Sequence, residues 1–417
     1  MNVVIIGGGI GGLTLALMLA RHGIAARVFE AAPRLKPAGV GINLLPHATR
    51  ALAELGLEPA LAKVGITTRE SVFFNRFGQL IYREPAGRFA GYDWPQFSLH
   101  RGDLQQVLLD AFAARIGPPG LFAGWRCIGL VEDPSGAVVH FRNAVTGAPL
   151  PAQHADVLIG CDGLHSMIRR ALHPEEGEAI YSGVNMWRGV ASWQPFLTGA
   201  SMVRAGWLKC GKMVIYPIRD RIDGQGRQLI NWVAEIETPQ HQARDWNRRG
   251  RSEDFIAAYE NWHFDWLDVP ALIRASDTIL EFPMVDQEPL PWWSRGRVTL
   301  LGDAAHPMYP RGSNGAGQAI LDAQALAECL PACPDPAVAL KTYEAKRLAA
   351  TASVVRMNRV NPPDAILREV YERSGDRPFE RIEELISSEE MKAISEGYKR
   401  VAGYDRDTLA GPLGGPS

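Results

Sequence analysis

The first residues whose types and spacing suggest chemistry are Gly7, Gly9 and Gly12, in the pattern Gly-x-Gly-x-x-Gly. The first glycine of such a turn permits a tight bend, the second lets the backbone approach a pyrophosphate, and the third lets a helix pack closely on a strand. Glu30 follows Gly12 by 18 residues, where a carboxylate accepts hydrogen bonds from ribose hydroxyls. Because that carboxylate disfavours a 2′-phosphate, the pattern predicts FAD or NAD rather than NADP.

Two further acidic motifs lie far downstream. Asp162 stands in Gly160-Cys161-Asp162-Gly163, and Asp303 stands in Gly302-Asp303-Ala304-Ala305-His306-Pro307. Each follows an apolar run, so each acid is expected at the carboxyl end of a strand, where open α/β sheets bind ligands. A lone Asp-Gly is more often a turn or a helix cap. The order of all three motifs is therefore the informative signal.

The elements that must position these residues follow from hydrophobic spacing. Residues 3–6 form an apolar strand-like run, 13–22 have helical spacing, and 26–29 predict a second strand. Residues 297–301 predict a buried strand before Asp303. This arrangement favours an α/β fold of the doubly wound kind.

The intervening segments are less regular. Residues 33–46 are rich in glycine and proline and are expected to form a loop, and residues 71–82 predict a hairpin. Residues 180–284 are expected to form a largely antiparallel sheet, with a helical insert at 253–262. Nine of the 11 tryptophans fall between Trp187 and Trp293, which marks this stretch as unusual.

Composition excludes several classes of protein. The 417 residues carry 44 Lys and Arg against 46 Asp and Glu, a net charge of −2, which argues against a nucleic-acid binder. No apolar run approaches the roughly 20 residues that span a bilayer. Five scattered cysteines suit a reducing compartment, and no zinc-like or other metal motif is present. We expect no secretory leader and a cytoplasmic location, because the opening residues already predict a strand.

With these three motifs in this order, the chain resembles the class A, single-component FAD-dependent aromatic monooxygenases of the para-hydroxybenzoate and salicylate hydroxylase superfamily. The resemblance runs from residue 2 to about 350. It implies that Arg101 contacts the FAD phosphates or ribityl chain, that Asp303 bonds the ribityl chain, and that the loop from Pro310 runs along the flavin ring. The cofactor-binding residues expected on this basis are Gly7, Gly9, Ile10, Gly11, Gly12, Glu30, Arg34, Gly41, Arg101, Asp162, Gly163, Asp303, Pro310, Gly315 and Ala316.

The chain departs from the commonest pattern after this proline, where it has Ser313-Asn314-Gly315-Ala316-Gly317. With Gly39-Val40-Gly41-Ile42-Asn43 and Met186-Trp187-Arg188-Gly189, that variant most resembles the phenazine-modifying branch, the 5-methylphenazine-1-carboxylate monooxygenase type. The resemblance implies that NADH or NADPH reduces FAD and that O2 then forms a flavin C4a-hydroperoxide, which hydroxylates an aromatic or N-heteroaromatic small molecule. Such an intermediate favours a closed apolar pocket.

The aromatic stretch supplies the substrate-pocket candidates, which are Trp187, Arg188, Trp207, Tyr216, Trp232 and Pro310. A tryptophan or tyrosine here is as well explained by packing between layers, and Arg188 by an ion pair in place of a substrate carboxylate. No residue is assigned as a catalytic acid or base. A flavin oxidase or dehydrogenase without oxygen insertion, and a non-catalytic FAD-binding sensor, remain alternatives.

The resemblance also implies a domain plan, in which a glutathione-reductase-like FAD-binding fold carries an inserted, mainly antiparallel substrate sheet and a C-terminal helical segment. The FAD-binding parts are expected at 1–70, 101–179 and 291–360. The substrate domain is expected at 71–100, as a hairpin, and at 180–290, with the helical segment and tail at 361–417. The expected partner is a small aromatic substrate, in a monomer or a homodimer, with no nucleic acid and no membrane span.

Overall fold

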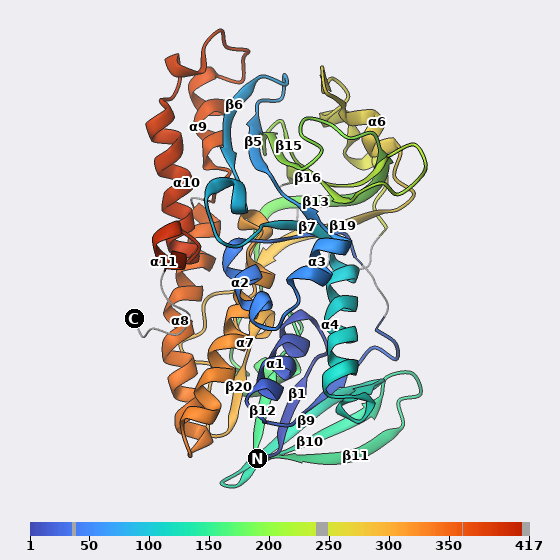
Figure 1. Ribbon diagram of the computed structural model, residues 1–417, viewed down its shortest axis with the longest axis vertical. Helices are drawn as coiled ribbons and strands as arrows, with labels where there is room; N and C mark the ends of the chain where they lie inside the picture. The colour runs from blue at the N-terminus through green and yellow to red at the C-terminus, as the bar shows by residue number, and fades with distance from the viewer. Residues whose placement is uncertain (36–38, 239–248, 361, 411–417) are drawn as a thin grey trace.

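The computed structural model describes residues 1–35, 39–238, 249–360 and 362–410. Its central layer is a five-stranded sheet in which every neighbouring pair is parallel (Figure 1). In spatial order the strands are β20 (Val298–Leu300), β12 (Val157–Gly160), β1 (Val3–Ile6), β2 (Ala26–Glu30) and β8 (Leu121–Ala123). Parallel alignment brings the carboxyl ends of β1, β12 and β20 to one edge. The residues that follow these strands are Gly7, Cys161 and Leu301.

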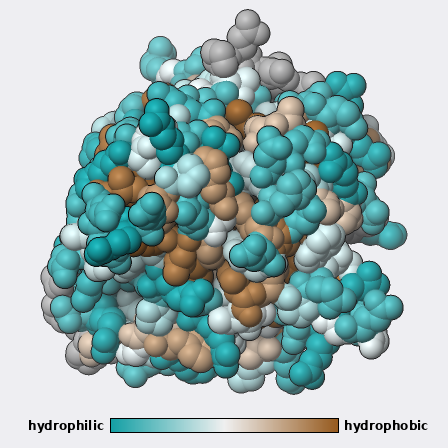
Figure 2. Space-filling view, turned by 90° about the horizontal axis from the view of Figure 1, so that it is seen from above, coloured by the Kyte–Doolittle hydropathy of each residue, from teal (hydrophilic) through white to brown (hydrophobic). Residues whose placement is uncertain are grey.

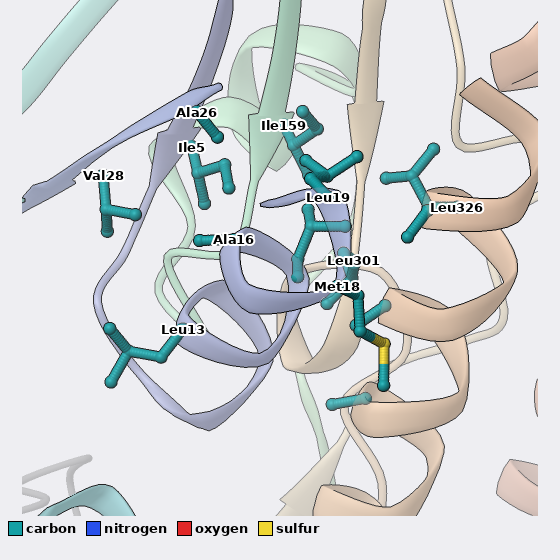
Figure 3. Packing of buried hydrophobic residues seen from close by; sticks show 14 of the residues in the cluster. Ile5, Leu13, Ala16, Met18, Leu19, Ala26, Val28, Ile159, Leu301 and Leu326 are labelled. Atoms are coloured by element: carbon teal, nitrogen blue, oxygen red, sulfur yellow. The ribbon is translucent and has the colours of Figure 1, made fainter. Parts of the chain in front are cut away.

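Helices cover one face of this sheet. Helix α1 (Ile10–Arg21) packs between the strands and α7 (Gly315–Ala332), with α4 (Arg101–Arg115) beside it. In Figure 3, Ala16 of α1 lies close to Ile5 of the sheet and Leu19 lies near Ile159, while Met18 lies beside α7. These side chains are almost fully buried, because both strand faces must be covered in a parallel sheet.

The opposite face is covered by a three-stranded antiparallel sheet. Its strands are β9 (Trp125–Asp133), β10 (Gly136–Asn143) and β11 (Pro149–Ala155), at the lower end of Figure 1. Phe29 of β2 stacks on Phe141 of β10 with ring centroids 4.7 Å apart. The short helix α5 (Met167–Leu172) follows β12 and contacts β9.

A seven-stranded sheet forms the upper half of the molecule in Figure 1. Its spatial order is β19 (Ile279–Asp286), β13 (Ile180–Trp193), β16 (Gln228–Glu237), β15 (Gly211–Arg219), β14 (Ser201–Trp207), β5 (Glu70–Phe74) and β6 (Leu80–Pro85). Only the β14–β5 pair is parallel. The hairpin predicted at 71–82 is present as β5 and β6, and it joins this sheet. Seen from above, the surface is mostly hydrophilic with apolar residues gathered toward its middle (Figure 2).

Two local expectations were wrong. The segment expected as a loop at 33–46 contains strand β3 (Gly41–Leu44), which pairs with β7 (Phe97–His100), and β7 pairs in turn with β4 (Ile66–Thr67). Strand β3 forms because β7, more than 50 residues later in the chain, supplies its ladder partners, a pairing that local composition does not reveal. Helices α2 (Pro46–Glu54) and α3 (Glu58–Val64) follow it.

The helical insert expected at 253–262 is limited to two short 3₁₀ turns. The segment packs through its aromatic side chains and does not continue as a helix. Phe255 stacks on Trp187, and Tyr259 contacts Trp262. The hairpin β17 (His263–Phe264) and β18 (Leu267–Asp268) follows, and then helix α6 (Val269–Arg274).

The C-terminal part is helical. Helix α8 (Pro336–Val360) packs on α7, and α9 (Ala365–Ser374), α10 (Ser388–Ala402) and α11 (Arg406–Ala410) follow. Helix α9 contacts β14 and β5, whereas α10 contacts α8, so the segment runs along one side of both sheets (Figure 1). Among the described residues, no helix is long and apolar enough to cross a membrane.

Candidate active site

The glycine turn after β1 has the geometry that a bound pyrophosphate needs. A Cβ on Gly7, whose φ is +108°, would lie 2.2 Å from the carbonyl oxygen of Cys161, and a Cβ on Gly12 would lie 2.0 Å from that of Gly7. A Cβ on Gly9 would meet no atom within 4 Å. Gly7 and Gly12 are thus required by the protein's own packing, while Gly9 borders open space at the start of α1. Free N–H groups and a partial positive charge are available there for an anionic group.

Glu30 lies at the end of β2 beside this turn. Its two carboxylate oxygens each accept one backbone hydrogen bond, from the N–H of Gly8 at 2.7 Å and from that of Ala32 at 2.7 Å. These bonds fix the carboxylate against the glycine turn. Each oxygen keeps a further lone pair, so Glu30 can still accept bonds from two ribose hydroxyls.

Asp303 lies in the short turn Gly302–Ala304 that follows β20. Its side chain is exposed to solvent, yet protein encloses it on several sides. This partial desolvation raises the pKa of its carboxyl, and the nearby His306 and Arg101 side chains act against that rise. A Cβ on Gly315, the first residue of α7, would lie 3.8 Å from Asp303 Oδ1. Three distant segments of the chain thus meet here and bring together Asp303, Arg101 and the N-terminus of α7.

A buried acid that the sequence analysis missed organises this turn. Asp322 of α7 accepts hydrogen bonds from the N–H of Gly302 (3.1 Å) and from Arg347 Nε (2.7 Å), and its Oδ2 lies 2.5 Å from His306 Nε2. Burial alone would raise the pKa of Asp322, but His306 and Arg347 together hold it below its usual value. A charged residue in the otherwise apolar run of α7 was the available signal.

Asp162 has a structural role in this site. Its carboxylate accepts bonds from Ser166 Oγ at 2.5 Å and from the N–H of Met167 at 2.7 Å, so it caps α5. The neighbouring Gly163, with φ +73°, borders open space. The motif's exposed part is therefore its backbone. Any contact of the Asp162 side chain with a cofactor stays a prediction.

The remaining predicted cofactor residues are placed variously around this edge. Ile10 and Gly11 lie in the first turn of α1, Arg34 is exposed after β2, and Pro310 is exposed in the loop that precedes α7. Ala316 follows Gly315 in the first turn of α7. The contacts of these residues with a cofactor also stay predictions.

The seven-stranded sheet meets this site through Gly41. Its N–H donates to Asn231 Oδ1 at 2.7 Å, and its carbonyl accepts from Arg188 Nη2 at 2.9 Å. A Cβ on Gly41 would lie 2.7 Å from both Asn231 and Tyr216. We name the sheet face that carries Arg188, Tyr216 and Asn231 the inner face. It holds the Gly39–Leu44 segment tightly enough that only glycine fits at position 41.

The expectation that Trp187 and Trp232 line a pocket together with Arg188 was wrong. Trp187 pairs across the sheet with Ala234, and Trp232 with Gly189, so both side chains point away from the inner face. They lie in a separate core with Phe255, and Trp232 donates to Ser276 Oγ at 2.8 Å. Alternation along the strands predicts two faces but does not say which one meets the cofactor.

The other pocket candidates are on or near the inner face. Tyr216 is buried, which raises the pKa of its hydroxyl, and the nearby Arg188 partly offsets this rise. Trp207 lies partly buried at the end of β14, after Gly206 with φ +70°, where it contacts clusters that include Met186 and Phe73. The inner face therefore offers Arg188, Tyr216 and Trp207, with no contribution from Trp187 or Trp232.

A cleft of about 850 Å³ lies elsewhere, beside Gly65, Asp103 and Arg219. It is open and polar, and Asp103 and Arg219 pair within it. It contains none of the motif residues, so the site is assigned by the convergence of Gly9, Glu30 and Asp303.

This combination of fold and site defines a dinucleotide-binding α/β protein with a second sheet set over the nucleotide edge. Residues 1–358 match the family described as FAD binding domain, and the chain belongs to that family. It is an FAD-dependent flavoprotein monooxygenase of the aromatic hydroxylase class, which uses NAD(P)H and O2.

The chain is 43% identical over 362 residues to the phenazine 1,6-dicarboxylic acid hydroxylase PhzS of Lysobacter antibioticus, covering 86% of this chain and 89% of that protein. It is 31% identical to 6-hydroxynicotinate 3-monooxygenase of Pseudomonas fluorescens, over 86% of this chain and 91% of the relative. Among solved structures, Klebsiella pneumoniae HpxO complexed with FAD and uric acid matches with a TM-score of 0.74 and 25% identity, covering 99% of this chain and 98% of that one.

Proposed function

We propose that this monooxygenase hydroxylates a planar N-heteroaromatic carboxylate of the phenazine type. The observation that carries this proposal is an arginine without a carboxylate partner in the described part of the chain, beside an apolar strip on the inner face. Arg188 has no ion-pair partner among the described residues, and its Nε is buried without an acceptor. An arginine in this state suits a carboxylate, which it can bind through two parallel hydrogen bonds.

The strip beside Arg188 is set by strand register. Arg188 pairs with Val233 of β16, and Val233 pairs with Val214 of β15. Two strand spacings extend this valine surface about 10 Å from Arg188. Val214 is partly exposed in the centre of the sheet, and we place the floor of the substrate site there. A fused aromatic ring system fits such a floor, and the 43% identical relative is named for a phenazine dicarboxylic acid.

The chain's own residues fit FAD beside this floor. Gly9 borders the space for the pyrophosphate, Glu30 offers acceptors to the ribose, and Asp303 with Arg101 faces the ribityl chain. FAD, when bound, would carry electrons from NAD(P)H to O2, and one oxygen atom of that O2 would be transferred to the substrate. The protein contributes binding, orientation and a dry surrounding.

Water exclusion is served by an apolar cluster between the inner face and the loop before α7. Val184, Met186, Leu208 and Met284 are buried there together with Tyr309. Tyr309 immediately precedes Pro310, so this cluster continues to the loop that we place along the flavin ring. An apolar wall of this kind keeps water out of the site and so protects reactive intermediates from side reactions.

The domain plan belongs to the same proposal. We place FAD in the doubly wound part formed by 1–70, 101–179 and 291–360. The substrate lies under the sheet contributed by 71–100 and 180–290. The helices α9 to α11 flank both parts, and the contacts of α9 with β14 and β5 support that placement.

The proposal is tested with FAD-loaded protein, NAD(P)H and ¹⁸O2, against a panel of phenazine carboxylates, unsubstituted phenazine, hydroxybenzoates and quinolones. We expect one labelled oxygen atom in the product of a carboxylated phenazine. Substrate-stimulated NAD(P)H consumption that gives only hydrogen peroxide would favour a flavin oxidase. If the purified protein takes up no FAD, the proposed catalytic function is wrong and only a non-catalytic role remains.

A second arm tests Arg188 itself. Arg188→Met should raise KM for the carboxylated substrate about 10- to 150-fold, the value of one charged hydrogen bond. It should change KM little for the ring without a carboxylate. Arg126→Met, at an exposed position on β9, is the matched control. Equal losses for both substrates would show that Arg188 serves only Gly41.

A further inference from the structure

The C-terminal helices reach the loop beside the proposed flavin ring, through residues that no motif singled out. Tyr398 of α10 is fully buried, and its hydroxyl donates to Asn358 Oδ1 at 2.8 Å. Asn358 in turn donates from Nδ2 to the carbonyl of Tyr309 at 3.0 Å. We name residues 309–314 the Pro310 loop. Its first carbonyl is thus held by a two-step chain of hydrogen bonds from α10.

The same hydroxyl shapes the middle of the loop. A Cβ on Gly312 would lie 1.5 Å from the Tyr398 hydroxyl oxygen, so the tyrosine occupies the space that a side chain would take. The loop follows this surface through Ser313, which adopts a left-handed φ of +53°. Gly312 and Tyr398 therefore form a matched pair, in which the backbone lies directly on the hydroxyl.

The end of the loop is fixed from the same region. Asn314 Oδ1 lies 2.8 Å from His47 Nε2 and accepts a bond from Gln318 Nε2 at 3.3 Å. Gln318 also donates to the carbonyl of Ala402, the last residue of α10, and His47 stacks on Tyr404. Burial lowers the pKa of His47 to about 4, so its ring is neutral in this contact at physiological pH.

Helix α10 also forms hydrogen bonds to the seven-stranded sheet, which we call the substrate sheet. Lys399, next to Tyr398, donates to Glu84 of β6 at 2.9 Å, and Ser395 donates to the same carboxylate. At the start of α9, Asp364 pairs with Arg204 of β14 at 2.9 Å. The helices thus connect the sheet that carries the substrate with the loop that meets the cofactor.

We propose that Tyr398 is a positioning residue for the flavin, which acts through Asn358 on the Pro310 loop. The proposal rests on the proposed function, because that function places the ring along this loop. Asn358 stands at the last position of the matched family segment, and Tyr398 lies beyond it, in the part of the chain outside residues 1–358. The C-terminal segment accordingly contributes to cofactor geometry as well as to packing.

The test compares Tyr398→Phe with the matched control Tyr371→Phe, on the partly exposed face of α9. Three readouts are taken, namely the dissociation constant for FAD, the visible spectrum of the bound flavin, and Tm. Tyr398→Phe should weaken FAD binding about two- to twelvefold, which corresponds to one lost hydrogen bond, and should shift the flavin spectrum. Tyr371→Phe should change neither.

A double variant tests whether the effect passes through Asn358. Asn358→Leu removes both bonds, so Tyr398→Phe added to it should weaken FAD binding no further. Additive losses would overturn the proposed route. A lowered Tm with unchanged FAD affinity and spectrum in Tyr398→Phe would show a merely structural role and overturn the proposal. These readouts need no substrate, so they remain informative if the panel of aromatic carboxylates yields no product.

Discussion

Replacement of Gly9 by alanine separates the needs of the fold from those of the cofactor. Gly9 has φ −76° and ψ −170°, an extended conformation that alanine adopts freely, and its Cβ would meet no protein atom within 4 Å. Alanine is a poorer N-cap than glycine, but it lowers the entropy of the unfolded chain. Because these effects oppose each other, we expect the free energy of unfolding of the FAD-free protein to change by less than about 1 kcal/mol.

The cofactor should respond differently. If the pyrophosphate passes over Gly9, a methyl group there intrudes on a close contact, at a cost of about 1–3 kcal/mol typical of overpacking. The dissociation constant for FAD should rise about 5- to 150-fold. Quenching of FAD fluorescence measures this constant, and thermal unfolding with and without FAD gives the two stabilities.

Two comparisons make the result decisive. In Gly12→Ala the new Cβ would lie 2.0 Å from the carbonyl oxygen of Gly7, a backbone atom that cannot rotate away, so both stability and FAD binding should fall. In Gly129→Ala, on β9, the Cβ meets nothing and neither property should change. If Gly9→Ala binds FAD like the wild type, the phosphates do not approach Gly9 and our placement of the cofactor is wrong.

Three further outcomes are expected. Glu30→Gln should weaken FAD binding about 10- to 150-fold by loss of a charged acceptor, and an unchanged affinity in a fluorescence titration would remove Glu30 from the site. Asp322→Asn leaves Arg347 facing a neutral partner in the interior and should lower stability by about 3–5 kcal/mol at pH 7. Because the folded pKa of Asp322 is lowered, this difference is complete above about pH 4 and should shrink as pH falls further, which denaturation at several pH values checks. Trp232→Phe should cost about 1 kcal/mol of stability through the lost bond to Ser276 and leave KM unchanged, and a raised KM would return this tryptophan to the pocket.

Sequence motifs are informative at positions where the chemistry of a site needs one particular residue type at the end of a strand. The predicted positions of Gly9, Glu30 and Asp303 after strands β1, β2 and β20 agree with the structure, because strand order in a parallel sheet brings such ends to one edge, and their contacts with FAD stay a prediction. The same approach missed Asp322, whose importance comes from neighbours 16 to 25 residues distant that meet it only in the folded chain. Hydrogen bonds between elements leave little trace in local spacing.

The tryptophan-rich stretch shows a second limit. Its composition marked a separate sheet, but the sequence analysis put Trp187 and Arg188 in one pocket, whereas as neighbours on β13 they lie on opposite faces of the sheet. Which face meets the cofactor depends on where the Gly39–Leu44 segment crosses the sheet. That crossing is fixed by the contacts of Gly41 with Arg188 and Asn231, across 147 and 190 residues of sequence. A long-range contact of this kind cannot be derived from strand propensity.

The two faces of this sheet then explain why the tryptophans are concentrated here. The outer face needs bulk, because Trp187, Trp232 and Phe255 must cover a wide sheet with only short helical turns above it. The inner face needs room, and beside Arg188 it carries Val233 and Val214, where we propose that an aromatic substrate lies. A tryptophan at either valine position would fill the space that this substrate requires. The excess of tryptophan therefore reflects the packing of the outer face of this sheet. In our proposal, substrate specificity depends on the smaller residues of the inner face.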